Sequence, residues 1–238
     1  MKKILILSVC LFVCWTISSA QQQRIKVACV GNSITYGTGL SDRLVQSYPV
    51  QLQKMLGTRY EVGNFGKPGA TLLNQGHRPY IRQEEYQKAL DFAGDIVVIH
   101  LGINDTDPRD WPNYRDSFVT DYLNLMDTFR KANPDVRIII ARMTPIADRH
   151  NRFLSGTRDW HGEMQTAIET VAHYAGVQLI DFREPLYPYP FLLPDAVHPT
   201  AEGAAIMAKT VYSAITGDYG GLKLSPLYMD NMVLQRDT

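Results

Sequence analysis

A serine hydroxyl, a histidine imidazole and an aspartate carboxylate occur at positions where they could act together. Ser33 follows an apolar run, and Asp195 and His198 lie three residues apart in a proline-flanked loop. A serine becomes a nucleophile when a base takes its proton, and the base needs a partner that fixes its tautomer. The Asp-x-x-His spacing lets the carboxylate reach one nitrogen of the same imidazole. The sequence therefore predicts Ser33 as nucleophile, His198 as general base and Asp195 as the acid that orients it.

Each of these residues also has an ordinary structural explanation. A serine directly after a strand is often the N-cap of a helix. An Asp-x-x-His segment before a proline is commonly a turn that carries a solvated histidine. What favours the catalytic interpretation is that the serine, a glycine, an asparagine and the Asp-x-x-His segment occur in one order along the chain.

Acyl transfer also needs hydrogen-bond donors for the oxyanion that develops on the attacked carbonyl. The candidates are the backbone N–H of Ser33, the backbone N–H of Gly69 and the side-chain amide of Asn104. Gly69 suits a close approach of backbone to ligand. Asn104 could instead be an Asx-turn residue.

The elements that would position these residues alternate between strand and helix. Val, Ile and Leu dominate two of the five predicted strands, as in strands that are covered on both faces. The predicted strands are Ile25–Val30, Tyr60–Phe65, Asp95–Leu101, Val136–Arg142 and Val177–Phe182, and the helical patterns are Tyr48–Leu56, Tyr114–Lys131, Trp160–Ala175 and Ala201–Ile215. This alternation predicts an α/β fold, a three-layer α/β/α domain over residues 24–217 with a five-stranded parallel sheet.

In such sheets, ligands bind at the carboxyl ends of the strands. Four segments with polar or glycine residues follow strands or lie in the last loop. They are Gly31-Asn32-Ser33-Ile34-Thr35, Gly66-Lys67-Pro68-Gly69-Ala70-Thr71, Gly102-Ile103-Asn104-Asp105 and Asp195-Ala196-Val197-His198-Pro199. We expect the four loops to meet at one edge of the sheet.

Four blocks resemble, in order, those of the GDSL/SGNH hydrolases: Gly31 to Thr35, Asn64 to Gly69, Gly102 to Asp105 and Asp195 to Pro199. The resemblance covers nearly all of the mature chain. It implies a flavodoxin-like hydrolase fold, a serine esterase activity and no cofactor. It also implies that Ser33, Gly69, Asn104 and His198 are the four residues that name the superfamily, with Asp195 as the triad acid. Asn32 departs from the pattern, because the family has aspartate before the serine.

Three other functions are weighed against this one. An α/β-hydrolase would need Gly-x-Ser-x-Gly, but Thr35 stands where the second glycine would be. The six histidines form neither His-x-x-x-His nor His-Glu-x-x-His, so we expect no metal. A sugar-binding module would explain the aromatic residues but would leave the serine, asparagine and Asp-x-x-His segment unexplained; these aromatics are Trp111, Tyr114, Tyr187 and Tyr189.

The N-terminus and the charge bear on location and partners. Two lysines, an apolar run and Ser18-Ser19-Ala20 predict a cleaved signal peptide over residues 1–20, hence a periplasmic or secreted protein without a membrane anchor.

A formal net charge of zero gives no reason to expect a nucleic-acid partner. Cleavage would leave Cys29 as a single thiol, which its apolar surroundings predict to be buried and inert. The oligomeric state stays open.

The tail and the loop after Asn104 bear on the substrate. Residues 218–238 are predicted to be a linker and the start of a β-rich module, since this tail resembles the opening of sialate O-acetylesterase domains. The loop 106–114 is polar and aromatic, which suits a sugar better than a fatty chain.

We therefore expect removal of O-acetyl groups from carbohydrate, with O-acetylated sialic acid as first candidate. Acetylxylan or pectin esterase, and lipase or thioesterase, are the alternatives. A sialic acid carboxylate would need an arginine, for which Arg109 and Arg142 are candidates.

Overall fold

The structure is a computed structural model that describes residues 23–151 and 156–220. The predicted signal peptide, and the predicted second module apart from residues 218–220, lie outside the described residues.

The centre of the fold is a five-stranded sheet in the order β2-β1-β3-β4-β5, in which all neighbouring strands are parallel. Its strands are β1 (Ile25–Gly31), β2 (Tyr60–Gly66), β3 (Ile96–His100), β4 (Arg137–Arg142) and β5 (Gln178–Asp181). Val27–Val30, Ile96–His100 and Ile138–Ala141 are buried, as β-branched runs covered on both faces should be. The predicted α/β fold and the five predicted strands are thereby confirmed.

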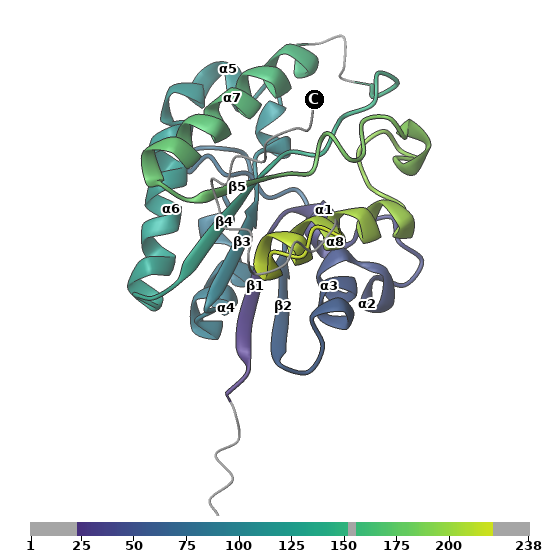
Figure 1. Cartoon of the computed structure of the whole chain (residues 1–238). Helices are drawn as coiled ribbons and strands as arrows, with labels where there is room; N and C mark the ends of the chain where they lie inside the picture. Colours follow the sequence, from purple (N-terminus) through teal and green to yellow (C-terminus); the bar gives the residue numbers. More distant parts are fainter. Residues whose placement is uncertain (1–22, 152–155, 221–238) are drawn as a thin grey trace, which may run out of the picture.

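Helices cover both faces of the sheet (Figure 1). α3 packs on α8 and β2, and on the other face α7 packs on α6 and β4 while α4 packs on β1 and β2. The helices are α1 (Ser33–Tyr36), α2 (Arg43–Gln46), α3 (Tyr48–Leu56), α4 (Glu84–Phe92), α5 (Trp111–Tyr114), α6 (Phe118–Ala132), α7 (Thr157–Ala175) and α8 (Ala201–Thr216), with short 3₁₀ helices at Tyr80–Arg82, Ile103–Thr106, Arg115–Ser117 and Pro190–Leu192.

The helix boundaries follow from local sequence. The apolar residues of α6 recur at three- and four-residue spacing, and this face is buried; it comprises Phe118, Tyr122, Leu125, Met126 and Phe129. α8 begins after Thr200, whose hydroxyl accepts a hydrogen bond from the backbone N–H of Gly203 at 3.2 Å. α4 was not predicted, because Ala89 is its one buried residue and its apolar pattern is correspondingly short.

The register of the sheet brings three loops to one level. Gly31, the last residue of β1, pairs with Gly66 of β2 and with His100 of β3. The loops that follow these strands therefore leave the same edge of the sheet side by side, as expected. No helix within residues 23–151 and 156–220 is long and apolar enough to cross a bilayer.

Candidate active site

Ser33 is the first residue of α1, directly after β1. Asn32 caps this helix, because its Oδ1 accepts the N–H of Ile34 at 2.9 Å, and its Nδ2 donates to the carbonyl of His100 at 3.4 Å. The N-cap explanation for Ser33 is therefore wrong, and the loop bonds of Asn32 are made although it is not aspartate. A Cβ on Gly31 would collide with the Thr35 side chain and lie 2.9 Å from the carbonyl of His100, so this tight turn needs glycine.

His198 connects Ser33 to Asp195. Its Nε2 lies 2.8 Å from Ser33 Oγ, and its Nδ1 lies 2.6 Å from Asp195 Oδ2. Because a carboxylate can only accept, Nδ1 donates, and the neutral ring presents Nε2 as an acceptor to the serine hydroxyl. Ser33 and His198, which meet at this contact, are 165 residues apart in sequence.

The turn from Asp195 to His198 is held by its own backbone. Asp195 Oδ1 accepts the N–H groups of Val197 at 3.0 Å and His198 at 2.7 Å. Burial opposes ionisation of this carboxyl, but these bonds and the His198 ring outweigh burial and hold the pKa of Asp195 below its usual value. Ala196 has φ of 75°, a left-handed conformation that is strained for a residue with a Cβ.

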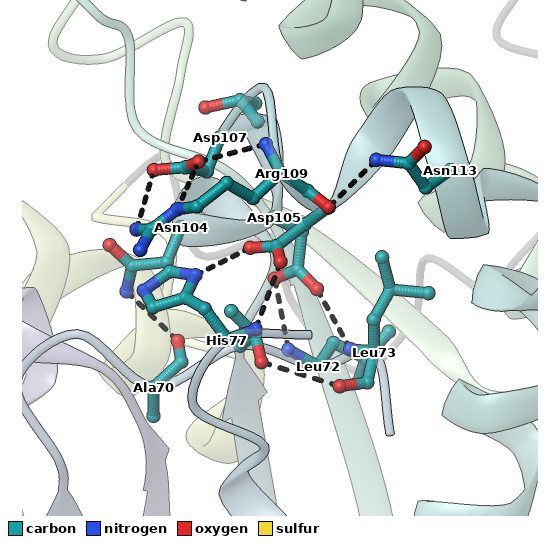
Figure 2. Close-up of polar contacts among 12 residues, drawn as sticks. Ala70, Leu72, Leu73, His77, Asn104, Asp105, Asp107, Arg109 and Asn113 are labelled. Atoms are coloured by element: carbon teal, nitrogen blue, oxygen red, sulfur yellow. Dashed lines mark hydrogen bonds and ion pairs between the residues drawn. The ribbon is translucent and has the colours of Figure 1, made fainter. Parts of the chain in front are cut away.

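The three predicted oxyanion donors have hydrogen atoms to spare. Neither the N–H of Ser33 nor that of Gly69 donates to another residue in the described part of the chain. Gly69 has φ of 77°, which glycine adopts without strain. Asn104 Nδ2 donates one of its two hydrogens to the carbonyl of Ala70 at 2.8 Å, which fixes the amide beside the Gly69 loop (Figure 2).

Carboxylates hold the loop that follows Gly69. Asp105 is fully buried, and its two oxygens accept the N–H groups of Leu72 and Leu73 at 2.9 and 2.7 Å (Figure 2). Burial raises the pKa of Asp105 to about 8, against the effect of these two bonds. Asp121 accepts both the backbone N–H and the side-chain Nδ2 of Asn74, each at 2.8 Å. The loop is thus fixed by side chains from residues 104–121.

A second His–Asp pair joins this loop to the loop that follows Asn104. Asp110 accepts the backbone N–H of His77 at 2.9 Å and the ring Nδ1 of His77 at 2.6 Å. The neighbouring Arg78 donates from Nη1 to the carbonyl of Pro68 at 3.0 Å, and Nη1 lies 3.2 Å from where a Cβ on Gly69 would be. Sequence analysis found none of these three residues. Their one signal is that His77 and Arg78 follow β2 and Asp110 follows β3, at the edge of the sheet where ligands bind.

The two arginines that were considered for a substrate carboxylate are engaged elsewhere. Arg109 forms an ion pair with Asp107, from Nε to Oδ1 at 2.9 Å. Arg142 pairs with Asp181 at 2.9 Å and with Glu169 at 3.3 Å. Arg78, in contrast, forms no ion pair with any residue that the structure describes.

Other reactive groups near the sheet are buried and neutral. Burial lowers the pKa of His100 to about 3 and that of His161 to about 4, and it raises the pKa of the Cys29 thiol to about 12. The expectation of a buried Cys29 is confirmed. Within the described ranges, no group of three or more His, Cys, Asp or Glu side chains is arranged to hold a metal ion.

Comparison with known proteins identifies relatives of this chain. The model of the GDSL-like lipase/acylhydrolase family matches residues 29–206. An acetylxylan esterase of Xylanibacter ruminicola is 32% identical over 221 residues, which cover 84% of this chain and 45% of that protein. The chain therefore spans less than half the length of that relative.

Solved structures of similar fold include two esterases. A carbohydrate acetylesterase family member from Sinorhizobium meliloti matches with a TM-score of 0.65 and 22% identity, over 82% of this chain and 99% of that one. The acetyl xylan esterase AlAXEase matches with a TM-score of 0.62 and 22% identity, over 80% of this chain and 100% of that one. These similarities agree with the parallel α/β fold.

Proposed function

Since the chain belongs to the GDSL-like lipase/acylhydrolase family, we propose that it is a serine esterase that removes O-acetyl groups from carbohydrate. The observation that carries this proposal is the continuous chain of hydrogen bonds from Ser33 Oγ through His198 to Asp195. Ser33 is the nucleophile, His198 the general base and Asp195 the residue that holds the imidazole in its tautomer.

The proposed reaction has two halves. Ser33 Oγ bonds to the acetyl carbon while its proton passes to His198 Nε2, and the sugar oxygen leaves with that proton. Water then attacks the acetyl-serine, gives its proton to His198, and Ser33 recovers a proton as acetate leaves. The N–H groups of Ser33 and Gly69 and the second amide hydrogen of Asn104 bind the oxyanion of both tetrahedral intermediates. No cofactor takes part in these steps.

The polar side chains beside these donors support a sugar as the alcohol part of the ester. His77, Arg78 and the Arg109–Asp107 pair lie on the loops that carry Gly69 and Asn104. A polyol can form further hydrogen bonds to such polar groups, whereas a fatty chain would displace water from them and offer no hydrogen bond in return. The acetylxylan esterase relative makes acetylated xylan the first substrate to test.

An acidic O-acetylated sugar, such as O-acetylated sialic acid, is the second candidate. The observation that favours it is Arg78, whose guanidinium lies beside Gly69 without an acidic partner among the described residues. A carboxylate on the substrate would supply that partner.

A panel of esters tests the proposal. The purified protein is assayed with acetylated xylan, O-acetylated sialic acid, and p-nitrophenyl acetate, butyrate and octanoate. We expect release of acetate from one of the glycans and a fall in rate with acyl length. Faster hydrolysis of octanoate than of acetate would replace the carbohydrate assignment with a lipid one. If acetate were released from O-acetylated sialic acid but not from acetylated xylan, and if Arg78→Gln abolished this release, the acidic sugar would be the substrate.

We also propose that the protein is exported. The basic, apolar and small-residue order of residues 1–20 supports this. N-terminal sequencing of protein from the culture medium and periplasm should begin near Gln21. Recovery of intact Met1 in a membrane fraction would contradict export by cleavage.

A further inference from the structure

His77 is held in one orientation by a buried carboxylate. Asp110 is 2% exposed and binds both the backbone N–H and the ring Nδ1 of His77, so the ring can neither rotate nor flip without losing a bond. Since the carboxylate accepts from Nδ1, the neutral ring carries its proton there. Nε2 is then left as a hydrogen-bond acceptor.

The Nε2 atom of this fixed ring has no partner in the described chain. No residue in ranges 23–151 and 156–220 forms a hydrogen bond to it, and the side chain is 26% exposed. The buried carboxylate fixes both the orientation and the tautomer of the ring, so Nε2 is held as a hydrogen-bond acceptor that faces solvent. An ordinary surface histidine has no such carboxylate and is free to rotate.

This open nitrogen belongs to the loop that carries Gly69, and it faces Asn104. Figure 2 shows the His77 ring bonded at one nitrogen, with its opposite edge turned toward the side chain of Asn104. Asn104 in turn bonds to Ala70, and the next residue after His77 places its guanidinium over Gly69. His77 and Arg78 therefore border the stretch of chain that would surround the attacked carbonyl.

From this arrangement we propose that His77 is a substrate-binding residue, whose Nε2 accepts a hydrogen bond from a sugar hydroxyl close to the acetylated oxygen. This inference rests on the proposed carbohydrate esterase function and adds a residue that selects the sugar. Nε2 offers an acceptor and Arg78 offers several donors, and together they complement neighbouring hydroxyl groups of a polyol.

The chain allows a variant that removes the acceptor and keeps the bond to Asp110. In His77→Asn, the amide Nδ2 stands where Nδ1 was and still donates to Asp110, but nothing replaces Nε2. His173→Asn, at an exposed position in the last turn of α7, is the matched control. Each variant and the wild type are assayed with acetylated xylo-oligosaccharide and with p-nitrophenyl acetate, which has no sugar hydroxyl.

We expect His77→Asn to lower kcat/KM for the acetylated sugar about 5- to 20-fold, mainly through KM, the usual effect of one lost hydrogen bond. The rate with p-nitrophenyl acetate should stay within about twofold of wild type. An unchanged ratio of the two rates would overturn the inference, and so would an equal loss on both substrates, which would mean that the loop has moved. If the wild-type protein cleaves p-nitrophenyl acetate but no acetylated sugar, the proposed function fails as well.

Discussion

The two His–Asp pairs of this molecule have almost the same local geometry and different surroundings. In both, the carboxylate lies 2.6 Å from the ring Nδ1 and also accepts the backbone N–H of the same histidine, at 2.7 Å in His198 and 2.9 Å in His77. The far nitrogen of His198 meets Ser33 Oγ, whereas that of His77 meets no described residue. The pair alone therefore fixes a tautomer, and what faces the other nitrogen decides the chemistry.

The carboxylates of the two pairs differ in exposure and in backbone strain. Asp195 is 53% exposed and lies in a turn that contains the strained Ala196, while Asp110 is 2% exposed. The first pair is built from residues three apart, so its turn must bend sharply to close. The second joins two loops 33 residues apart, and it also serves to fix one loop on the other.

The largest expected effect separates the pairs by activity. His198→Ala should lower kcat by on the order of 10⁴- to 10⁶-fold, because the base and its proton path are lost. His77→Ala should lower the rate with p-nitrophenyl acetate less than about tenfold, because its ring touches no group that reacts. Steady-state assays of both variants check this. Losses of equal size would show that the two pairs do not have different roles.

Replacing each aspartate by asparagine tests what the tautomer of its histidine contributes in each pair. Asp195→Asn should hold His198 in the wrong tautomer and cost about 10⁴-fold in kcat on every ester. Asp110→Asn should do the same to His77, turning Nε2 into a donor, with a loss confined to sugar esters. The assay is the same pair of substrates for both variants. A general loss of activity in folded Asp110→Asn would assign that pair to the reaction itself.

Asn104 tests the proposed oxyanion site. Asn104→Ala should reduce kcat by about 100- to 1,000-fold, the usual effect of removing one oxyanion donor. Asn113→Ala is the matched control, because the exposed side-chain amide of Asn113 donates to the carbonyl of Arg109 and to no other residue in the described ranges. Near-normal kcat for Asn104→Ala would limit that residue to holding the Ala70 carbonyl.

The smallest expected effects concern pH and stability. Burial lowers the pKa of His100 to about 3, and neither ring nitrogen has a hydrogen-bond partner among the residues that the structure describes. The unfolded chain takes up this proton below about pH 6.5, and the folded protein does not, so stability is lost as pH falls from there toward 3. His100→Leu should remove this loss, about 1.4 kcal/mol per pH unit. Urea unfolding of the wild type, His100→Leu and the control His173→Leu at pH 7, 6 and 5 measures this loss. If the free energy of unfolding changed with pH equally in the wild type and His100→Leu, the prediction would be contradicted.

The fold and part of the site were accessible from sequence because their signals are local. β-branched runs and helical spacing predicted the strands and most helices, and the Asp195–His198 contact spans one turn. Ser33 and His198 are 165 residues apart, so only the rule that loops gather at the carboxyl edge of a parallel sheet predicted their meeting.

Other features had no local signal. The pairing of His77 with Asp110 depends on two loops that no spacing connects, and Arg78 lies over Gly69 because the chain turns back after Thr71, whose N–H bonds to the carbonyl of Arg78 at 2.8 Å. The ion pair of Arg109 with Asp107 likewise depends on loop geometry. Substrate-binding residues were therefore unknown from sequence, whereas the proposed nucleophile was not.

The central claim, that Ser33 attacks the ester, is tested most directly by covalent labelling of the nucleophile. The protein is treated with a serine-directed organophosphonate ester, and the modified residue is located by peptide mass spectrometry. The account predicts one adduct, on Ser33, with loss of activity in proportion to labelling, and no adduct on Ser33→Ala, which is inactive. Labelling of a different residue, or normal turnover by Ser33→Ala, would contradict it.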